Sequence, residues 1–187
     1  MKGFLIRYKY RGAKPSSSYS YQRFFRALYG YTQVVTKANG ASYVYYREGV
    51  LTTYPYIHEG RNTMIIPENA LEPLISFFKE GKNPAHTFED LSNWTVTYYV
   101  EEIPVDPPSA LRAIYSALNR ILVRTPEGYI RLRELIQKDS LDADELSALH
   151  TYSRNIVESS WYKSLKDSDP LLKKLQEHLN HAVQTVL

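Results

Sequence analysis

Two clusters of residues have types and spacing that could support metal binding or catalysis. His178 and His181 lie three residues apart beside Glu177 in a segment with helical spacing, so both imidazoles could face the same way. A zinc site needs three or four protein ligands as a rule, and the sequence supplies no third ligand nearby. We therefore predict no metal site. The absence of cysteine also excludes thiolate nucleophiles and Cys-based zinc or iron–sulfur centres.

The second cluster is the polar segment around His58. His58 could act as a general base, and Arg61 could stabilise negative charge that develops on a phosphate. No pattern places a second histidine or a carboxylate with them, and the run His-Glu-Gly-Arg-Asn is also typical of a polar β-turn. A nuclease-like enzyme centred on His58 is kept as a second alternative, and we expect no catalytic residues in the leading interpretation.

Motifs for nucleotide cofactors and for serine nucleophiles are missing from the sequence. Neither a Gly-x-x-x-x-Gly-Lys-Ser/Thr loop nor a Gly-x-Gly-x-x-Gly loop occurs, and no Ser stands in a Gly-x-Ser-x-Gly context. The acidic residues Asp142, Asp144 and Glu145 lack the glycine and the distal Glu of a calcium loop. They are better explained by the start of a helix, whose dipole favours acids. We predict no cofactor.

A basic, serine-rich loop is the most specific candidate for anion binding. Residues 11–18 combine Arg11 and Lys14 with three serines, and a predicted helix carrying Arg23 and Arg26 follows. Serine hydroxyls and the amides at a helix start can both donate to phosphate oxygens. The alternative is an ordinary polar connection.

Positive charge and tyrosine are both concentrated in the first third of the chain. Residues 1–66 hold ten Lys and Arg against two acidic residues, a formal +8, while residues 67–187 carry −5. Eleven of the seventeen tyrosines also precede residue 67. Cations together with flat rings suit a polyanion that presents bases for stacking. The alternative is that tyrosine, a good strand former, is half-buried on a sheet with a basic outer face.

The leading hypothesis is a non-enzymatic nucleic-acid-binding protein, an accessory or regulatory factor, with RNA favoured over DNA. The first alternative is a subunit of a protein assembly that uses the Tyr- and Arg-rich sheet as an interface, because interfaces are enriched in both residues. The predicted phosphate contacts are Arg7, Lys9, Arg11, Lys14, Arg23, Arg26, Lys37 and Arg47, and the predicted stacking residues are Tyr19, Tyr43, Tyr45 and Tyr46.

The elements that must position these residues alternate between strand and helix patterns. Residues 3–11 alternate with a period of two, which predicts a strand with one basic face. Residues 19–29 have helical spacing and end at Gly30. Residues 31–37 and 41–47 are rich in β-formers and joined by Asn39-Gly40, a strong hairpin signal in which both turn positions take positive φ. Further strands are predicted over 49–56, 63–66 and 95–103, and a helix over 67–80.

This order predicts an α+β fold in which a ferredoxin-like βαββαβ antiparallel sheet contains an inserted hairpin at 49–66. Such a sheet has two helices on one face and leaves the other face free for a ligand. The RNA-recognition motif uses the same plan, and residues 41–46 loosely resemble its aromatic strand. They lack the basic-Gly pair that opens that strand, so no membership is inferred.

The sequence pattern changes after the prolines at 104, 107 and 108, from alternating Tyr-rich segments to helical spacing. Helices are predicted over 109–124, 130–138, 142–166 and 170–186. We therefore expect two domains, a basic Tyr-rich one over 1–106 and an acidic helical one over 107–187. The apolar stripes of these helices are explained most commonly by packing against one another or against the first domain. As the alternative, exposed Trp161-Tyr162 and Leu171-Leu172 could form a protein-partner site. No segment has the length of a membrane helix or a signal peptide, so we expect a cytoplasmic protein without membrane contact.

Overall fold

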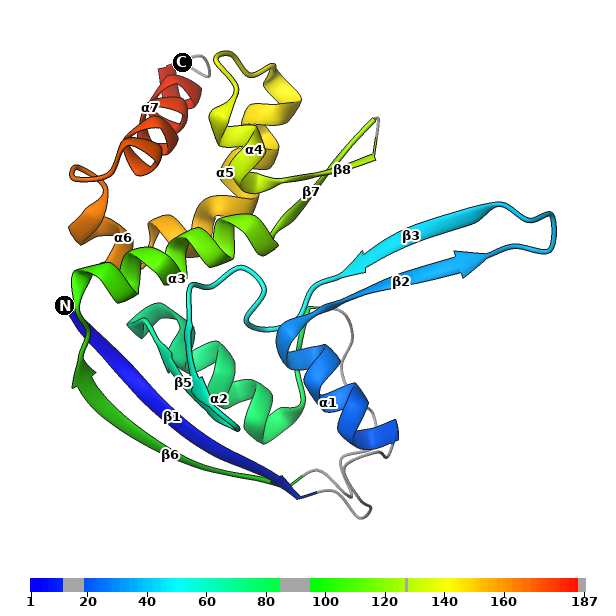
Figure 1. The fold of residues 1–187 in the computed structure, drawn as a ribbon, viewed down its shortest axis with the longest axis vertical. Helices are drawn as coiled ribbons and strands as arrows, with labels where there is room; N and C mark the ends of the chain where they lie inside the picture. Colours follow the sequence, from blue (N-terminus) through cyan, green and yellow to red (C-terminus); the bar gives the residue numbers. More distant parts are fainter. Residues whose placement is uncertain (12–18, 85–94, 127, 185–187) are drawn as a thin grey trace.

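The computed structural model describes residues 1–11, 19–84, 95–126 and 128–184. Most of the serine-rich loop, including Lys14, lies outside these ranges. The chain forms an α+β structure with an antiparallel sheet, followed by helices that pack on that sheet (Figure 1).

The main sheet has four strands in the order β4-β5-β1-β6. These are β1 (Lys2–Arg11), β4 (Ile57–Gly60), β5 (Thr63–Ile66) and β6 (Thr95–Pro104). Every neighbouring pair is antiparallel, and Ile6 of β1 lies opposite Met64 of β5 and Val100 of β6. The predicted period-two strand is confirmed, and it forms the centre of the sheet.

One face of the sheet is covered by α1 (Tyr19–Tyr29) and α2 (Leu71–Glu80), with a short 3₁₀ turn η1 (Glu68–Ala70) before α2. Ile6 and Tyr8 point to this face and are buried against Phe24 of α1 and against Phe78 of α2. The Tyr8 and Phe78 ring centroids are 5.3 Å apart. Because side chains alternate along a strand, Arg7 and Lys9 necessarily point to the opposite face.

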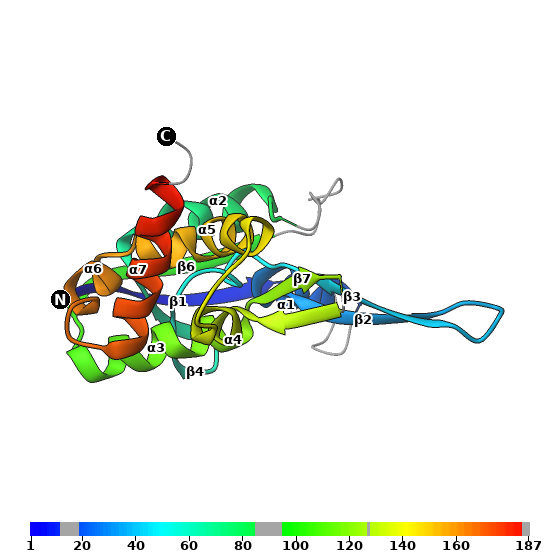
Figure 2. The ribbon, with the colours of Figure 1, turned by 90° about the horizontal axis from the view of Figure 1, so that it is seen from above.

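The hairpin formed by β2 (Tyr31–Thr36) and β3 (Ser42–Arg47) stands apart from the main sheet and projects from the body (Figures 1 and 2). This corrects the expected sheet, which contained 31–47 and treated 49–66 as the insertion. Instead, β5 pairs with β1 and β4 pairs with β5, and residues 49–56 form turns rather than a strand. Val50 and Leu51 are buried in these turns, so the apolar residues that predicted a strand belong to the core without forming one.

The hairpin turn also differs from the expected one. Gly40 has a φ of 80°, but Asn39 has no positive φ. The Gly40 amide donates to the Lys37 carbonyl oxygen, and the Lys37 amide donates to the Ala41 carbonyl oxygen. The Asn39 side chain accepts from the Ala41 amide at 3.1 Å. This is a three-residue loop, in which only the glycine takes the left-handed conformation.

The chain after residue 106 contains five helices and one hairpin within the described residues. The elements are α3 (Pro107–Arg120), β7 (Leu122–Thr125), β8 (Gly128–Arg131), α4 (Leu132–Gln137), α5 (Ala143–Val157), α6 (Ser160–Leu165) and α7 (Pro170–Gln184). The β7–β8 hairpin was not expected, and it shortens the helices predicted on either side. The single helix predicted over 142–166 is two, because Ser159 caps a new helix by accepting from the Tyr162 amide.

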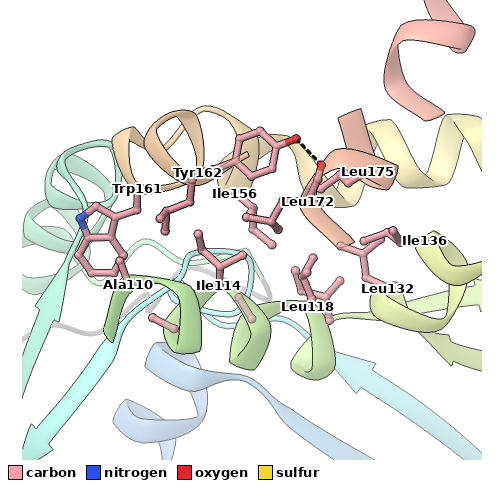
Figure 3. Close-up of a cluster of buried hydrophobic side chains, with 14 of the residues drawn as sticks. Ala110, Ile114, Leu118, Leu132, Ile136, Ile156, Trp161, Tyr162, Leu172 and Leu175 are labelled. Atoms are coloured by element: carbon pink, nitrogen blue, oxygen red, sulfur yellow. Dashed lines mark hydrogen bonds between the residues drawn. The ribbon is translucent and has the colours of Figure 1, made fainter. Parts of the chain in front are cut away.

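A second core joins the helices to the other face of the sheet. Ile114 and Leu118 of α3 pack with Trp161, Tyr162 and Leu172, as Figure 3 shows. Sheet residues also belong to this cluster, and the Trp161 indole N–H donates to the Lys2 carbonyl oxygen at 2.7 Å. The expectation of an exposed partner site is therefore wrong for Trp161, Tyr162 and Leu172, which are buried.

The boundary between residues 106 and 107 stays a prediction. Ile65 and Val105 lie in the same core as α3, so the two parts share buried apolar surface. Among the described residues, no helix is both long and apolar enough to span a bilayer.

Candidate nucleic-acid interface

The projecting hairpin, residues 31–47, is called the arm here, and one of its faces is cationic and aromatic. The strand register places Tyr31 opposite Arg47 and Val35 opposite Tyr43, while Tyr45 lies opposite Gln33. We call the face formed by Tyr31, Gln33, Val35, Tyr43, Tyr45 and Arg47, with Lys37 at its end, the cationic face.

Cations lie over the rings of this face. The Lys37 ammonium nitrogen is 4.6 Å from the Tyr43 ring centroid, and the Arg47 guanidinium carbon is 5.7 Å from that of Tyr45. The guanidinium carbon of Arg26 in α1 is 5.1 Å from the Tyr31 ring centroid, so a third cation lies over a ring at the base of the arm. Tyr43 and Tyr45 remain 41 % and 39 % exposed. The face therefore combines accessible flat rings with positive charge.

The electrostatics of this region are one-sided. Residues 19–47, which form α1 and the arm, contain four Lys and Arg and no acidic residue, and the first carboxylate is Glu48 at the base of the arm. Glu48 is half-buried, and this burial raises the pKa of its carboxyl group. A surface with cations and without carboxylates attracts a polyanion along its whole length.

The opposite face of the arm has a different character. Thr32, Val34, Thr36, Ser42 and Val44 alternate with the cationic residues and form what we call the neutral face. Val34 is 63 % exposed and Val44 is 49 % exposed. Two opposed valines at such exposure form a small apolar patch without charge.

Close backbone contacts at the base fix the direction of the arm. Gly30 ends α1 with a φ of 79°, and Gly49 approaches it so closely that a Cβ at Gly49 would collide with the Gly30 amide nitrogen. The Val50 and Leu51 amides donate to carbonyl oxygens of α1, each at 2.9 Å. The hydroxyl of Thr52 accepts from the Gly49 amide and donates to the Tyr29 carbonyl oxygen. These hydrogen bonds hold the segment that follows β3 to α1, the helix from which β2 continues.

Tyr46 belongs to this base rather than to the cationic face. Its hydroxyl donates to the Arg120 carbonyl oxygen of α3 at 3.3 Å, and burial raises its pKa. Tyr46 therefore anchors the arm to the helices, and we leave it out of the stacking residues.

Arg7, Lys9 and Arg11 lie on a separate surface. They are exposed on β1, on the sheet face that α1 and α2 do not cover, where Arg7 pairs with Tyr99 of β6 and Lys9 with Thr97. Sequence reasoning placed these three cations with those of the arm. The structure divides them because the arm continues from α1, on the other side of the sheet.

Three other predicted residues cannot be assigned to the arm. Arg23 is half-exposed on α1, where its charge lowers the pKa of Tyr10 against a larger rise that burial causes. Lys14 lies outside the described residues. Tyr19 begins α1, but its side chain is also outside them.

His58 is exposed on β4, next to an irregularity in the pairing with β5. Its Nδ1 accepts from the Gly60 amide at 3.3 Å, so this nitrogen is occupied by the turn itself. In the described ranges, no three His, Asp or Glu side chains gather closely enough to hold a metal ion. In the predicted His178 and His181 pair, only the His178 side chain belongs to the described part of the chain. Its Nε2 lies 3.1 Å from the Ile136 carbonyl oxygen.

Sequence reasoning missed three exposed residues that resemble the predicted set. Tyr99 lies on the open sheet face, and Arg124 and Tyr129 lie opposite each other in the β7–β8 hairpin. The Pro126 and Gly128 turn was an available signal for that hairpin, but the apolar spacing before it favoured a helix.

Comparison of the chain with known protein families, curated proteins and solved structures gave no significant match.

Proposed function

We propose that this protein binds nucleic acid without acting on it as an enzyme, and that the cationic face of the arm is the binding surface. Unpaired strands are the preferred form, because exposed tyrosine rings can stack only on bases that are not already stacked in a duplex. RNA is favoured over DNA, since folded RNA presents unpaired bases in loops and bulges.

The observation that carries the proposal is the placement of cations over exposed tyrosines. Lys37 lies over Tyr43 and Arg47 lies over Tyr45, and the two tyrosines are two residues apart on β3. Successive same-face residues are separated by about 6.8 Å along a strand. The arm thus offers two ring-and-cation units in a row, suited to a chain of alternating bases and phosphates.

The salt dependence of binding tests the charges. We expect Lys37→Gln with Arg47→Gln to make the plot of log K against log[salt] shallower by about 1.4 for a single-stranded RNA, because each phosphate contact contributes about 0.7. The matched control is Lys163→Gln with Lys173→Gln, which removes the same charge from exposed positions of α6 and α7. If the two pairs change the slope equally, the arm is not the binding surface.

Replacing the rings tests stacking separately. Tyr43→Leu or Tyr45→Leu should weaken single-strand binding by about 1–3 kcal/mol for each stacked base. The slope should stay nearly unchanged, since stacking releases few ions. An unaltered affinity in both variants, with an unchanged melting curve, would remove stacking from the proposal.

A second candidate function is supported by the neutral face. Val34 and Val44 form an exposed apolar patch that a protein partner could cover, and the face carries no charge to oppose a second copy of itself. Sedimentation equilibrium of the full chain tests this candidate. It predicts self-association that Val34→Thr with Val44→Thr weakens, whereas a monomer at all concentrations counts against it.

We also infer that the sheet follows the ferredoxin-like plan with a different assignment of strands. With β1, β4, β5 and β6 taken as the four strands and α1 and α2 as the helices, the order β4-β5-β1-β6 supports this plan. The arm would then be the insertion between the first helix and the second strand.

A further inference from the structure

A groove lies between the outer edge of β3 and the β7–β8 hairpin. Its volume is about 440 Å³, within the range of small-ligand sites. Tyr43 and Tyr45 line it from the arm, and Arg124, Thr125 and Tyr129 line it from the hairpin. The two walls come from segments about 80 residues apart in the sequence.

The chemistry of the hairpin wall repeats that of the arm. Arg124 and Tyr129 are opposite each other in the strand register, so their side chains share one face of the hairpin. Tyr129 is 38 % exposed, and Arg124 is exposed as well. None of the described residues that line the groove is acidic. The wall opposite the arm therefore adds a third ring and a further cation.

We propose that this groove takes one unpaired base of the bound strand, with Tyr129 contacting the base and Arg124 the adjoining phosphate. This inference rests on the proposed function and extends it by naming a pocket for a single nucleotide. The flat π-face of a base matches the tyrosine rings of both walls, and the arginine supplies the positive charge that a phosphate needs. A base held in a duplex cannot enter a groove between two protruding hairpins, so the pocket selects unpaired strands.

An extended peptide that pairs with the free edge of β3 is the competing occupant. Backbone pairing would give affinity without using the Tyr129 ring or the Arg124 charge. The lining favours a nucleotide, because the hairpin wall offers a ring and a cation.

The test compares full-length variants in binding to one oligoribonucleotide, offered as a single strand and as a perfect duplex. Tyr129→Leu should weaken single-strand binding by about 5- to 150-fold, the loss expected for one stacked base, and leave duplex binding unchanged. Tyr129→Phe keeps the ring and should retain the affinity. Arg124→Gln should reduce the salt slope by about 0.7. Tyr99→Leu removes an exposed tyrosine from the open sheet face and is the matched control.

The outcomes separate this inference from the proposed function. If Tyr129→Leu and Arg124→Gln change nothing while the Lys37 and Arg47 pair still weakens binding, the groove proposal is overturned and the arm proposal stands. A peptide-binding groove would give that result too. If Tyr129→Leu weakens single-strand and duplex binding equally, selection for an unpaired base is overturned. If the arm pair also has no effect, the proposed function itself fails.

Discussion

Arg120 shows at the scale of one residue how the helices hold the arm in place. Its guanidinium donates to the carbonyl oxygens of Leu51, Thr52 and Tyr54 at 2.7–3.2 Å and lies 4.4 Å from the Tyr56 ring centroid. Burial lowers its pKa, but the carbonyl dipoles and the ring face stabilise the charged form. This buried cation of α3 thus fixes the turns that follow the arm.

Glu48 gives a pH prediction at the same scale. Burial raises its pKa above the ordinary 4.5, so the folded protein holds this proton more tightly than the unfolded chain does. Protonation of Glu48 therefore stabilises the folded protein relative to the unfolded chain. This contribution is complete below pH 4.5 and is lost as the pH rises through the raised pKa. We expect Glu48→Gln to melt about 1–3 °C above the wild type at pH 7, a modest shift because the group is only half-buried. At pH 4 the two melting temperatures should coincide, and an equal difference at both values would contradict this explanation.

At the scale of elements, the arm depends on its base because neither of its faces is packed. An isolated two-stranded hairpin is marginally stable in water. Its strands are held by the close approach of Gly30 and Gly49 and by the hydrogen bonds of Thr52. The position of the cationic face is therefore determined where the arm meets α1 and α3, rather than along the arm itself.

The glycine at this junction gives the second prediction. Gly49→Ala places a Cβ against backbone, which cannot move as a flexible side chain can, and should lower the free energy of unfolding by about 2 kcal/mol or more. Gly40→Ala at the tip meets nothing within 4 Å and should cost only about 1–2 kcal/mol for its left-handed backbone, confined to the arm. Urea denaturation measures both. Equal small losses would show that the base can relax.

At the scale of the whole molecule, the sheet is packed on both sides. Aromatic residues of α1 and α2 cover one face, and α3 with Trp161 covers part of the other. The strand β1 contributes to both cores, since Ile6 is buried in one and Leu5 packs against the other. Loss of either core should therefore destabilise the strand that the two cores share.

Trp161 gives the third prediction. Trp161→Ala should lower the free energy of unfolding by about 3–5 kcal/mol through the cavity it leaves. Trp161→Phe should cost less, although it also loses the hydrogen bond to the Lys2 carbonyl oxygen. In both variants we expect far-ultraviolet circular dichroism and tyrosine fluorescence to report one cooperative transition. Two separate transitions would instead indicate that 1–106 and 107–187 unfold independently.

The local elements were largely predictable from the sequence. The period of two in β1, the helical spacing of α1 and the helix end at Gly30 all depend on neighbouring residues and are confirmed. Asp142 and Glu145 form the predicted helix start, where each side chain accepts from the other's amide. The predictions were wrong where the local pattern was ambiguous. The apolar run predicted as the end of a helix forms β7, and the predicted strand at Val50 and Leu51 forms buried turns.

The sequence by itself determined the excess of cations and tyrosines at the N-terminal end, and it predicted the hairpin that carries two ring-and-cation units. Only the tertiary structure decided which of these residues share a surface. Arg7 and Lys9 were separated from the arm because β1 pairs with β5 and β6 rather than with the strands of the arm. Arg124 and Tyr129 were brought to the arm by the packing of α3. Pairing and packing depend on contacts between distant segments, and the period of a sequence does not encode which distant segment will provide them.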